Sequence, residues 1–228
     1  MLTKEQIEYL FAFCRQHFVQ YYEVQVELVD HLANAVEIEM ENDSKLTFEK
    51  AIEKVHRSFG VMGFAPLVAE KQKSAEKQSG MLFWKLFKAQ FKWPKVVTFF
   101  LLVALFFTLF SADVFMAKLV LLGTILFSWI SHLISLRKLQ KLVSGTGKKF
   151  LILNVSWFSS LILFPTYFVG YSKFFEETGL LNHTPYNILA ISICLSLYII
   201  IIITTFQALS SIKQTLINNY PEVFSLAE

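Results

Sequence analysis

The chain has few of the residues that build covalent cross-links, metal centres or catalytic sites. Its cysteines are Cys14 and Cys194, which fall in different predicted parts of the molecule, so we expect neither a disulfide nor a cysteine-based metal site. Glycine is sparse, at 8 of 228 residues. The patterns of a phosphate-binding glycine loop, a His-Glu-x-x-His helix and a nucleophilic triad are all missing. These gaps argue against an enzyme and predict no cofactor.

The chain also begins without a basic and apolar leader. Its first residues, Met-Leu-Thr-Lys-Glu-Gln, are polar, so we expect no cleavable signal peptide. The chain is rich in hydrophobic residues, which make up 54% of it against 17% charged residues, and its mean hydropathy is +0.49. Four apolar stretches follow residue 93, at 94–111, 114–135, 150–170 and 187–209. Each approaches the roughly 20 residues with which a helix crosses ~30 Å of hydrocarbon, which predicts four transmembrane helices.

Loop charges predict the orientation of these helices, because cytoplasmic loops carry the excess of lysine and arginine. The segment before the first stretch is rich in lysine: Lys71, Lys73, Lys77, Lys85, Lys88, Lys92 and Lys95. The loop between the second and third stretches is basic and contains no acid: Arg137, Lys138, Lys141, Lys148 and Lys149. We therefore expect an inner (cytoplasmic) membrane protein with a cytoplasmic N-terminus and a cytoplasmic tail at 210–228.

Residues 1–79 are predicted to form a cytosolic helical head. Thr3 and Gln6 fit a capping box at the start of a first helix, and a second, longer helix follows. Thr47 is the predicted N-cap of a third helix, which Gly60 ends. Each helix carries an apolar face. The expected fold class is therefore all-α, a cytosolic helical bundle plus a four-helix transmembrane bundle over 94–209.

The order of motifs in this head resembles a known domain. The motifs are Tyr-Glu-Val-Gln-Val-Glu-Leu-Val-Asp-His at 22–31 leading to Glu37, Thr-Phe-Glu-Lys-Ala at 47–51, Phe59-Gly60, and Pro-Leu-Val-Ala at 66–69. Over residues 3–70 this order resembles the short helical domain that precedes membrane segments in HAAS-type and permease-prefix proteins of bacteria. The resemblance implies a cytosolic interaction or signalling module, sometimes encoded beside PadR-like transcription regulators. It does not cover the predicted membrane helices.

Charge divides the front of the chain. Residues 1–60 carry six basic against eleven acidic side chains, a net charge of −5, and residues 61–95 carry a net charge of +5. An acidic head argues against nucleic-acid binding and suits a protein partner with a basic surface. We predict that one stripe of the second helix binds this partner through Glu23, Glu27, Asp30 and Glu37. The alternative is a solvated helix face without a partner.

The segment 80–93 is predicted to be an interfacial amphipathic helix. Its lysines share one face and its aromatic residues lie opposite, in the set Trp84, Lys85, Phe87, Lys88, Phe91, Lys92 and Trp93. This pattern is typical of a helix in the inner headgroup layer, where lysines meet anionic lipid. The alternative is an extension of the first span.

Polar residues inside the predicted spans are candidate functional residues. His132, Asn154 and Gln207 fall at similar depths near the cytoplasmic side, so they could line a path; the alternative is hydrogen bonding between helices. His31 lies one turn after Glu27 in the head, but a zinc site needs three or four ligands that converge. We therefore predict no metal site.

Together these features predict a non-enzymatic bacterial inner-membrane protein whose head docks a partner, as a signalling or regulatory protein or as a subunit of a complex. The alternative function is a small transport or channel subunit, for which a homo-oligomer is one arrangement. An enzyme acting on lipid would need a catalytic cluster that the sequence does not contain.

Overall fold

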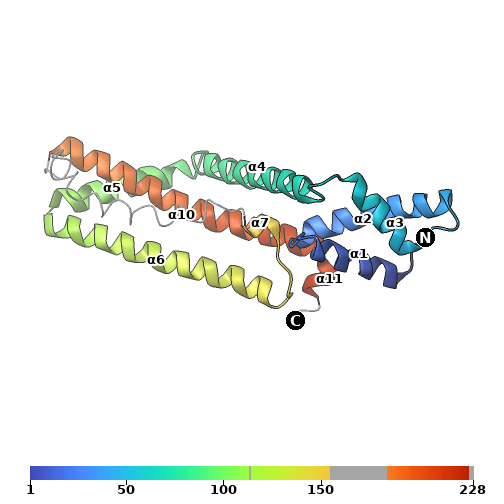
Figure 1. Cartoon of the computed structure of the whole chain (residues 1–228). Coiled ribbons are helices and arrows are strands. Elements are labelled where there is room, and N and C mark those ends of the chain that lie inside the picture. The colour runs from blue at the N-terminus through green and yellow to red at the C-terminus, as the bar shows by residue number, and fades with distance from the viewer. Residues whose placement is uncertain (113, 155–183, 226–228) are drawn as a thin grey trace. The chain divides into compact units, whose positions relative to one another are not determined.

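The computed structural model of the chain describes residues 1–112, 114–154 and 184–225, which are helical apart from their connections (Figure 1). Within these ranges there is no strand, and the one extended pairing is an isolated bridge between Tyr21 and Lys149. The all-α class is therefore confirmed for the described residues. The chain forms two compact units: Met1–Lys77 with a segment that begins at Thr146, and Gln78–Gly145 with the C-terminal part of the chain.

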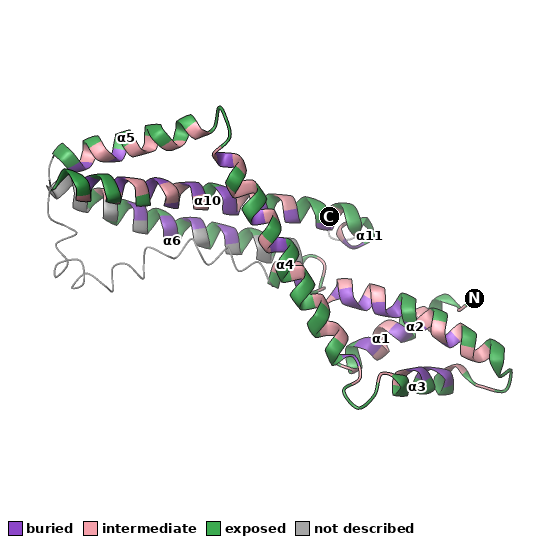
Figure 2. Ribbon diagram, turned by 90° about the horizontal axis from the view of Figure 1, so that it is seen from above, coloured by how far each residue is buried: buried purple, intermediate pink, exposed green. Residues whose placement is uncertain are grey.

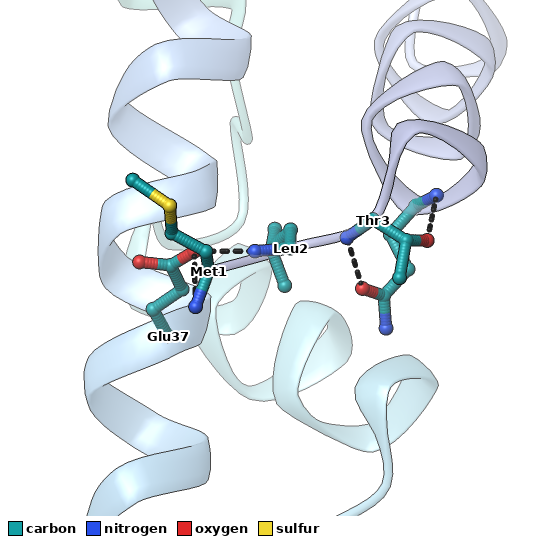
Figure 3. A network of polar contacts seen from close by, with 5 residues as sticks. Met1, Leu2, Thr3 and Glu37 are labelled. Atoms are coloured by element: carbon teal, nitrogen blue, oxygen red, sulfur yellow. Dashed lines mark hydrogen bonds and ion pairs between the residues drawn. The ribbon is translucent and has the colours of Figure 1, made fainter.

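The head unit begins with α1 (Lys4–Gln16), and the predicted capping box is present at its start. Thr3 Oγ1 accepts from the Gln6 N–H at 3.3 Å, and Gln6 Oε1 accepts from the Thr3 N–H at 2.8 Å (Figure 3). Then follow α2 (Tyr22–Asn42) and α3 (Phe48–Ser58). Thr47 is the N-cap of α3, as predicted, although no side-chain hydrogen bond closes that cap.

The apolar faces of α1, α2 and α3 pack into one core, whose buried residues are purple in Figure 2. Its buried members include Leu10, Cys14, Val19, Val24, Leu28, Leu32, Val36, Ala51 and Ile52. Burying one leucine or isoleucine contributes about 1.5–3 kcal/mol relative to leaving it exposed. Burial also raises the pKa of the Cys14 thiol to about 12, so this thiol is a neutral core group and not a nucleophile.

The next helix, α4 (Ala65–Gln90), is continuous. The sequence analysis ended the head at residue 79 and began a separate interfacial helix at residue 80, whereas α4 runs through this boundary without a break. Its interior contains no proline after its first turn, and its one glycine, Gly80, costs only about 1 kcal/mol in a helix. A single glycine therefore does not end it.

The second unit contains α5 (Val96–Ala112), α6 (Val114–Ser144), α10 (Pro185–Asn219) and the short α11 (Pro221–Phe224). Figure 1 shows α5, α6 and α10 side by side. Phe106 and Phe110 of α5 pack against Ile188 and Leu195 of α10. Thr184 caps α10 by accepting from the Asn187 N–H at 3.3 Å.

One described helix, α10, is long and apolar enough to cross a membrane, with a mean hydropathy of 2.6 over its best window. Two of the other predicted spans correspond to shorter apolar helices, at Val96–Ala112 and Leu122–Ser135. The third, at 150–170, lies outside the described residues after Asn154. The four-span bundle is thus supported in the described part of the chain by α10 alone.

Candidate functional site

The segment 146–154, here called the docked segment, lies against the start of α2 within the head unit. It ends in a short helix, α7 (Leu151–Asn154). The Tyr22 N–H donates to the Lys149 carbonyl at 2.8 Å, beside the parallel bridge that joins Tyr21 to Lys149. Residues more than 120 positions apart are therefore joined by backbone pairing, a contact that no local sequence pattern predicts.

Glu23, in the first turn of α2, caps the N-terminus of α7. Its Oε2 accepts from the Leu151 N–H at 2.6 Å and its Oε1 accepts from the Ile152 N–H at 3.5 Å. The first N–H groups of α7 have no partner within their own helix, so the carboxylate performs the task of an N-cap. Burial raises the pKa of Glu23, and the hydrogen bonds from Leu151 and Ile152 partly offset this rise.

Side chains add further contacts to the docked segment. The Lys148 ammonium lies 3.6 Å from the centre of the Tyr22 ring, and Phe150 meets the same ring edge-on at 6.0 Å. The Tyr21 hydroxyl accepts from Asn154 Nδ2 at 2.9 Å. Leu151 is only 4% exposed and belongs to the head's hydrophobic core. The segment is therefore held by apolar burial as well as by polar bonds.

Three of the four predicted partner-binding acids have contacts within the chain. Besides Glu23, Glu27 forms an ion pair with Lys71 at 2.5 Å. Glu37 accepts from the Leu2 N–H at 2.6 Å and lies 3.4 Å from the Met1 amino group (Figure 3). Asp30 is exposed. An outside partner would find Asp30 open and would have to compete for the other three carboxylates.

The predicted interfacial residues lie at the end of α4 and just after it. Lys85, Lys88 and Lys92 are exposed. Next to them is a row of rings: Trp84 contacts Phe87 at 5.5 Å, and Phe87 contacts Phe91 at 5.3 Å. Trp84 is 50% exposed and Trp93 is 81% exposed. Large exposed rings beside exposed lysines have the chemistry of a membrane interface.

Of the predicted layer of His132, Asn154 and Gln207, two side chains have described hydrogen bonds. Asn154 bonds to Tyr21 in the head unit. Gln207 Oε1 accepts from Gln90 Nε2 at 2.7 Å in the second unit. His132 lies in α6, and its side chain is outside the described residues. Gln207 is therefore hydrogen-bonded to a residue of α4.

A pair of histidines that the sequence analysis did not connect joins the end of α1 to the end of α3. The rings of His17 and His56 lie 4.1 Å apart, and Phe64 meets both edge-on. His56 Nε2 is buried without a hydrogen-bond partner. Burial first and the nearby His17 second lower the pKa of His56. Across the described residues, no group of three or more His, Cys, Asp or Glu side chains could hold a metal ion.

Fold and site together define a class: an all-helical chain with a compact acidic helical unit that holds a distant segment, and a helix able to cross a membrane. Comparison with known proteins adds no family, since no protein-family model, curated protein or solved structure matches the chain.

Proposed function

We propose that this is a non-enzymatic bacterial inner-membrane protein whose cytosolic head docks a protein partner, as a signalling or regulatory protein or as a subunit of a complex. One observation supports this most directly. The head already binds a segment distant in sequence, through the Tyr22 backbone and the Glu23 carboxylate. Backbone pairing and carboxylate capping depend little on side-chain identity, so the same chemistry suits a second polypeptide.

The charge of the head favours a basic partner surface. Residues 1–60 carry a net charge of −5, and Asp30 is exposed near the middle of α2. Opposite charge speeds encounter and selects the partner, and this effect weakens with salt. The ion pair between Glu27 and Lys71 shows that this stripe accepts an ammonium group. We place the partner-facing centre at Asp30, with Glu27 released when the partner replaces Lys71.

The membrane part of the proposal places α10 and three further spans in the inner membrane, with both termini cytoplasmic. The end of α4 and residues 91–93 then lie in the inner headgroup layer. The exposed lysines Lys85, Lys88 and Lys92 support contact with anionic lipid there.

Capture experiments with charge variants test the docking proposal. Full-length protein in mild detergent is compared with Asp30→Lys and with Glu49→Lys, a matched control that makes the same charge change at an exposed site on α3. The wild type and the control are expected to capture the same protein, in a salt-dependent manner, and Asp30→Lys is expected to lose it. Equal capture by both variants would contradict a partner site on α2.

The alternative, a small transport or channel subunit, predicts something different. Flux through proteoliposomes would persist in Asp30→Lys and would fall when His132 is replaced by alanine. Among the described contacts, Gln207 is bonded to Gln90, which gives it a packing role and adds no support for a path.

A further inference from the structure

The side chains of His17 and His56 join two helices of the head unit by ring packing. His17 follows the last residue of α1, and His56 lies in the last turn of α3. Their rings lie 4.1 Å apart. Phe13 and Phe64 each meet the His56 ring in an edge-to-face arrangement, at 5.3 Å and 4.9 Å. The two imidazoles are therefore packed as aromatic groups, which suits their neutral forms.

One nitrogen of this pair has no partner among the described residues. His56 Nε2 is buried without a hydrogen bond. A Cβ added to Gly63 would lie 3.2 Å from it, so the backbone of the turn between α3 and α4 lies against this atom. A neutral imidazole with its proton on Nδ1 leaves Nε2 as an empty acceptor, whereas the imidazolium carries an N–H on both nitrogens. Protonation therefore creates a buried donor with no acceptor, which is unfavourable.

The groups around the pair do not stabilise a positive charge. Neither histidine forms an ion pair with a carboxylate in the described part of the chain. On α3, Glu53 pairs with Arg57 at 3.7 Å. A cavity of about 370 Å³ lies beside the pair, and its other lining residues, from the turn and the first turns of α4, are apolar residues, a glycine and the neutral Gln72. The titratable group that faces His56 is thus His17, itself a histidine.

The turn over Nε2 is held mainly by backbone hydrogen bonds. The Gly60 N–H donates to the Arg57 carbonyl and the Gly63 N–H donates to the Gly60 carbonyl, both at 3.1 Å. Between the two glycines, Val61 and Met62 are exposed, at 105% and 71%. Because these side chains bury little apolar surface, movement of the turn is the least costly way to bring water to Nε2.

We propose that His17, His56 and the turn at 60–63 form a pH-sensitive switch. The turn covers His56 while its imidazole is neutral, and it opens to water when His56 takes up a proton. Phe64 packs against both histidines and directly precedes α4, so opening loosens the start of this helix. The head thereby responds to acidification. This inference goes beyond docking and requires no partner.

The direction of the response follows from the closed form. Burial first and His17 second lower the pKa of His56 from its ordinary value of 6.5. The open form therefore binds the proton more tightly than the closed form does. The stability of the closed form is complete well above pH 6.5 and falls as the pH drops below 6.5.

The test measures hydrogen exchange of the full-length protein in a neutral detergent, at about pH 7.5 and about pH 5.5, on either side of the ordinary value of 6.5. Rates are corrected for the intrinsic effect of pH on exchange. The amides at 60–65 are compared with those at 28–32, in the buried part of α2. In the wild type, protection at 60–65 is expected to fall severalfold at the lower pH, while protection at 28–32 does not fall.

Three variants assign the effect to the pair. His56→Gln keeps a neutral polar side chain that does not titrate and is expected to abolish the pH response. His17→Gln removes the neighbouring charge and is expected to weaken it. His31→Gln, a matched control at an exposed histidine of α2, is expected to respond like the wild type. The proposal is overturned if wild-type protection at 60–65 falls no more than at 28–32, or if His56→Gln and His17→Gln both respond like the wild type.

Discussion

At the scale of single residues, Glu23 shows how one carboxylate can serve two parts of the chain. It lies in the first turn of α2, where an acidic side chain is favourable, and it caps α7 from outside. Sequence alone placed Glu23 on the acidic stripe but assigned it to an outside partner. The periodicity of α2 predicts which face of the helix Glu23 occupies. It does not predict that the Leu151 N–H, distant in sequence, donates to Glu23 on that face.

Replacing Glu23 should release α7. In Glu23→Ala the Leu151 and Ile152 N–H groups lose their acceptor, and loss of a cap costs about 1–2 kcal/mol. We expect their hydrogen exchange to become roughly tenfold faster, since 1.4 kcal/mol is a factor of ten. Asp30→Ala, which removes an exposed acid from the same helix, should leave both amides unchanged. Unchanged exchange in Glu23→Ala would show that the cap does not hold the segment.

The pH dependence of Glu23 follows from the direction of its shift. Burial raises its pKa above the ordinary value of 4.5, so the folded head binds this proton more tightly than the unfolded chain does. The resulting stability is complete below pH 4.5 and is lost as the pH rises through the raised pKa. Relative to Glu23→Gln, the wild type should therefore gain stability as the pH falls from 7 toward 4.5, measured by chemical unfolding in detergent. A difference that stays constant with pH would contradict this.

Two glycines between α3 and α4 allow a matched comparison of alanine substitutions. Gly60 and Gly63 both have positive φ, at +75° and +51°, so alanine costs about 1–2 kcal/mol at either position. At Gly63 the added Cβ would also lie 3.2 Å from His56 Nε2, whereas nothing lies within 4 Å of a Cβ at Gly60. We expect Gly63→Ala to lower the free energy of unfolding by about 1 kcal/mol more than Gly60→Ala. Equal losses would mean that the His56 ring moves freely.

At the scale of elements, local signals predicted helix starts and one helix end, since α3 ends at Ser58 and Gly60 follows its C-cap with a φ of +75°. The capping box at Thr3 and the N-cap position at Thr47 are set by neighbouring residues, and the structure confirms both positions. The docked segment could not be found in the same way. Phe150-Leu151-Ile152-Leu153 reads as the start of an apolar span, yet Leu151 is buried in the head core. Apolar residues are equally suited to lipid and to a protein interior, so composition cannot separate these two cases.

The end of α4 allows a test at this scale. With Trp84 as the only tryptophan, after Trp93→Phe, Trp129→Phe and Trp157→Phe, we expect its fluorescence in anionic lipid vesicles to be quenched most by lipids brominated near the headgroup. A chain that keeps only Trp129, inside the predicted second span, should be quenched most by deeply brominated lipids. Quenching of Trp84 by aqueous iodide alone would place this end of α4 in water.

At the scale of the whole molecule, the sequence predicted the helical class and an acidic head, and the described residues form two helical units. It did not predict that the head unit includes residues from the loop between the second and third predicted spans. The lysines of this loop, Lys148 and Lys149, were taken only as signs of topology, and they also contact Tyr22 and Gln20. Such tertiary roles depend on contacts between distant parts of the chain.

The central claim is that the head is a docking module on a membrane protein. The most direct measurement compares affinity capture by the full-length protein with capture by a chain that lacks residues 1–70, both extracted in mild detergent. The account predicts a stoichiometric protein partner that binds the full chain, is lost on deletion and weakens with added salt. A full-length protein that captures no partner, or a partner retained equally by the shortened chain, would contradict the claim.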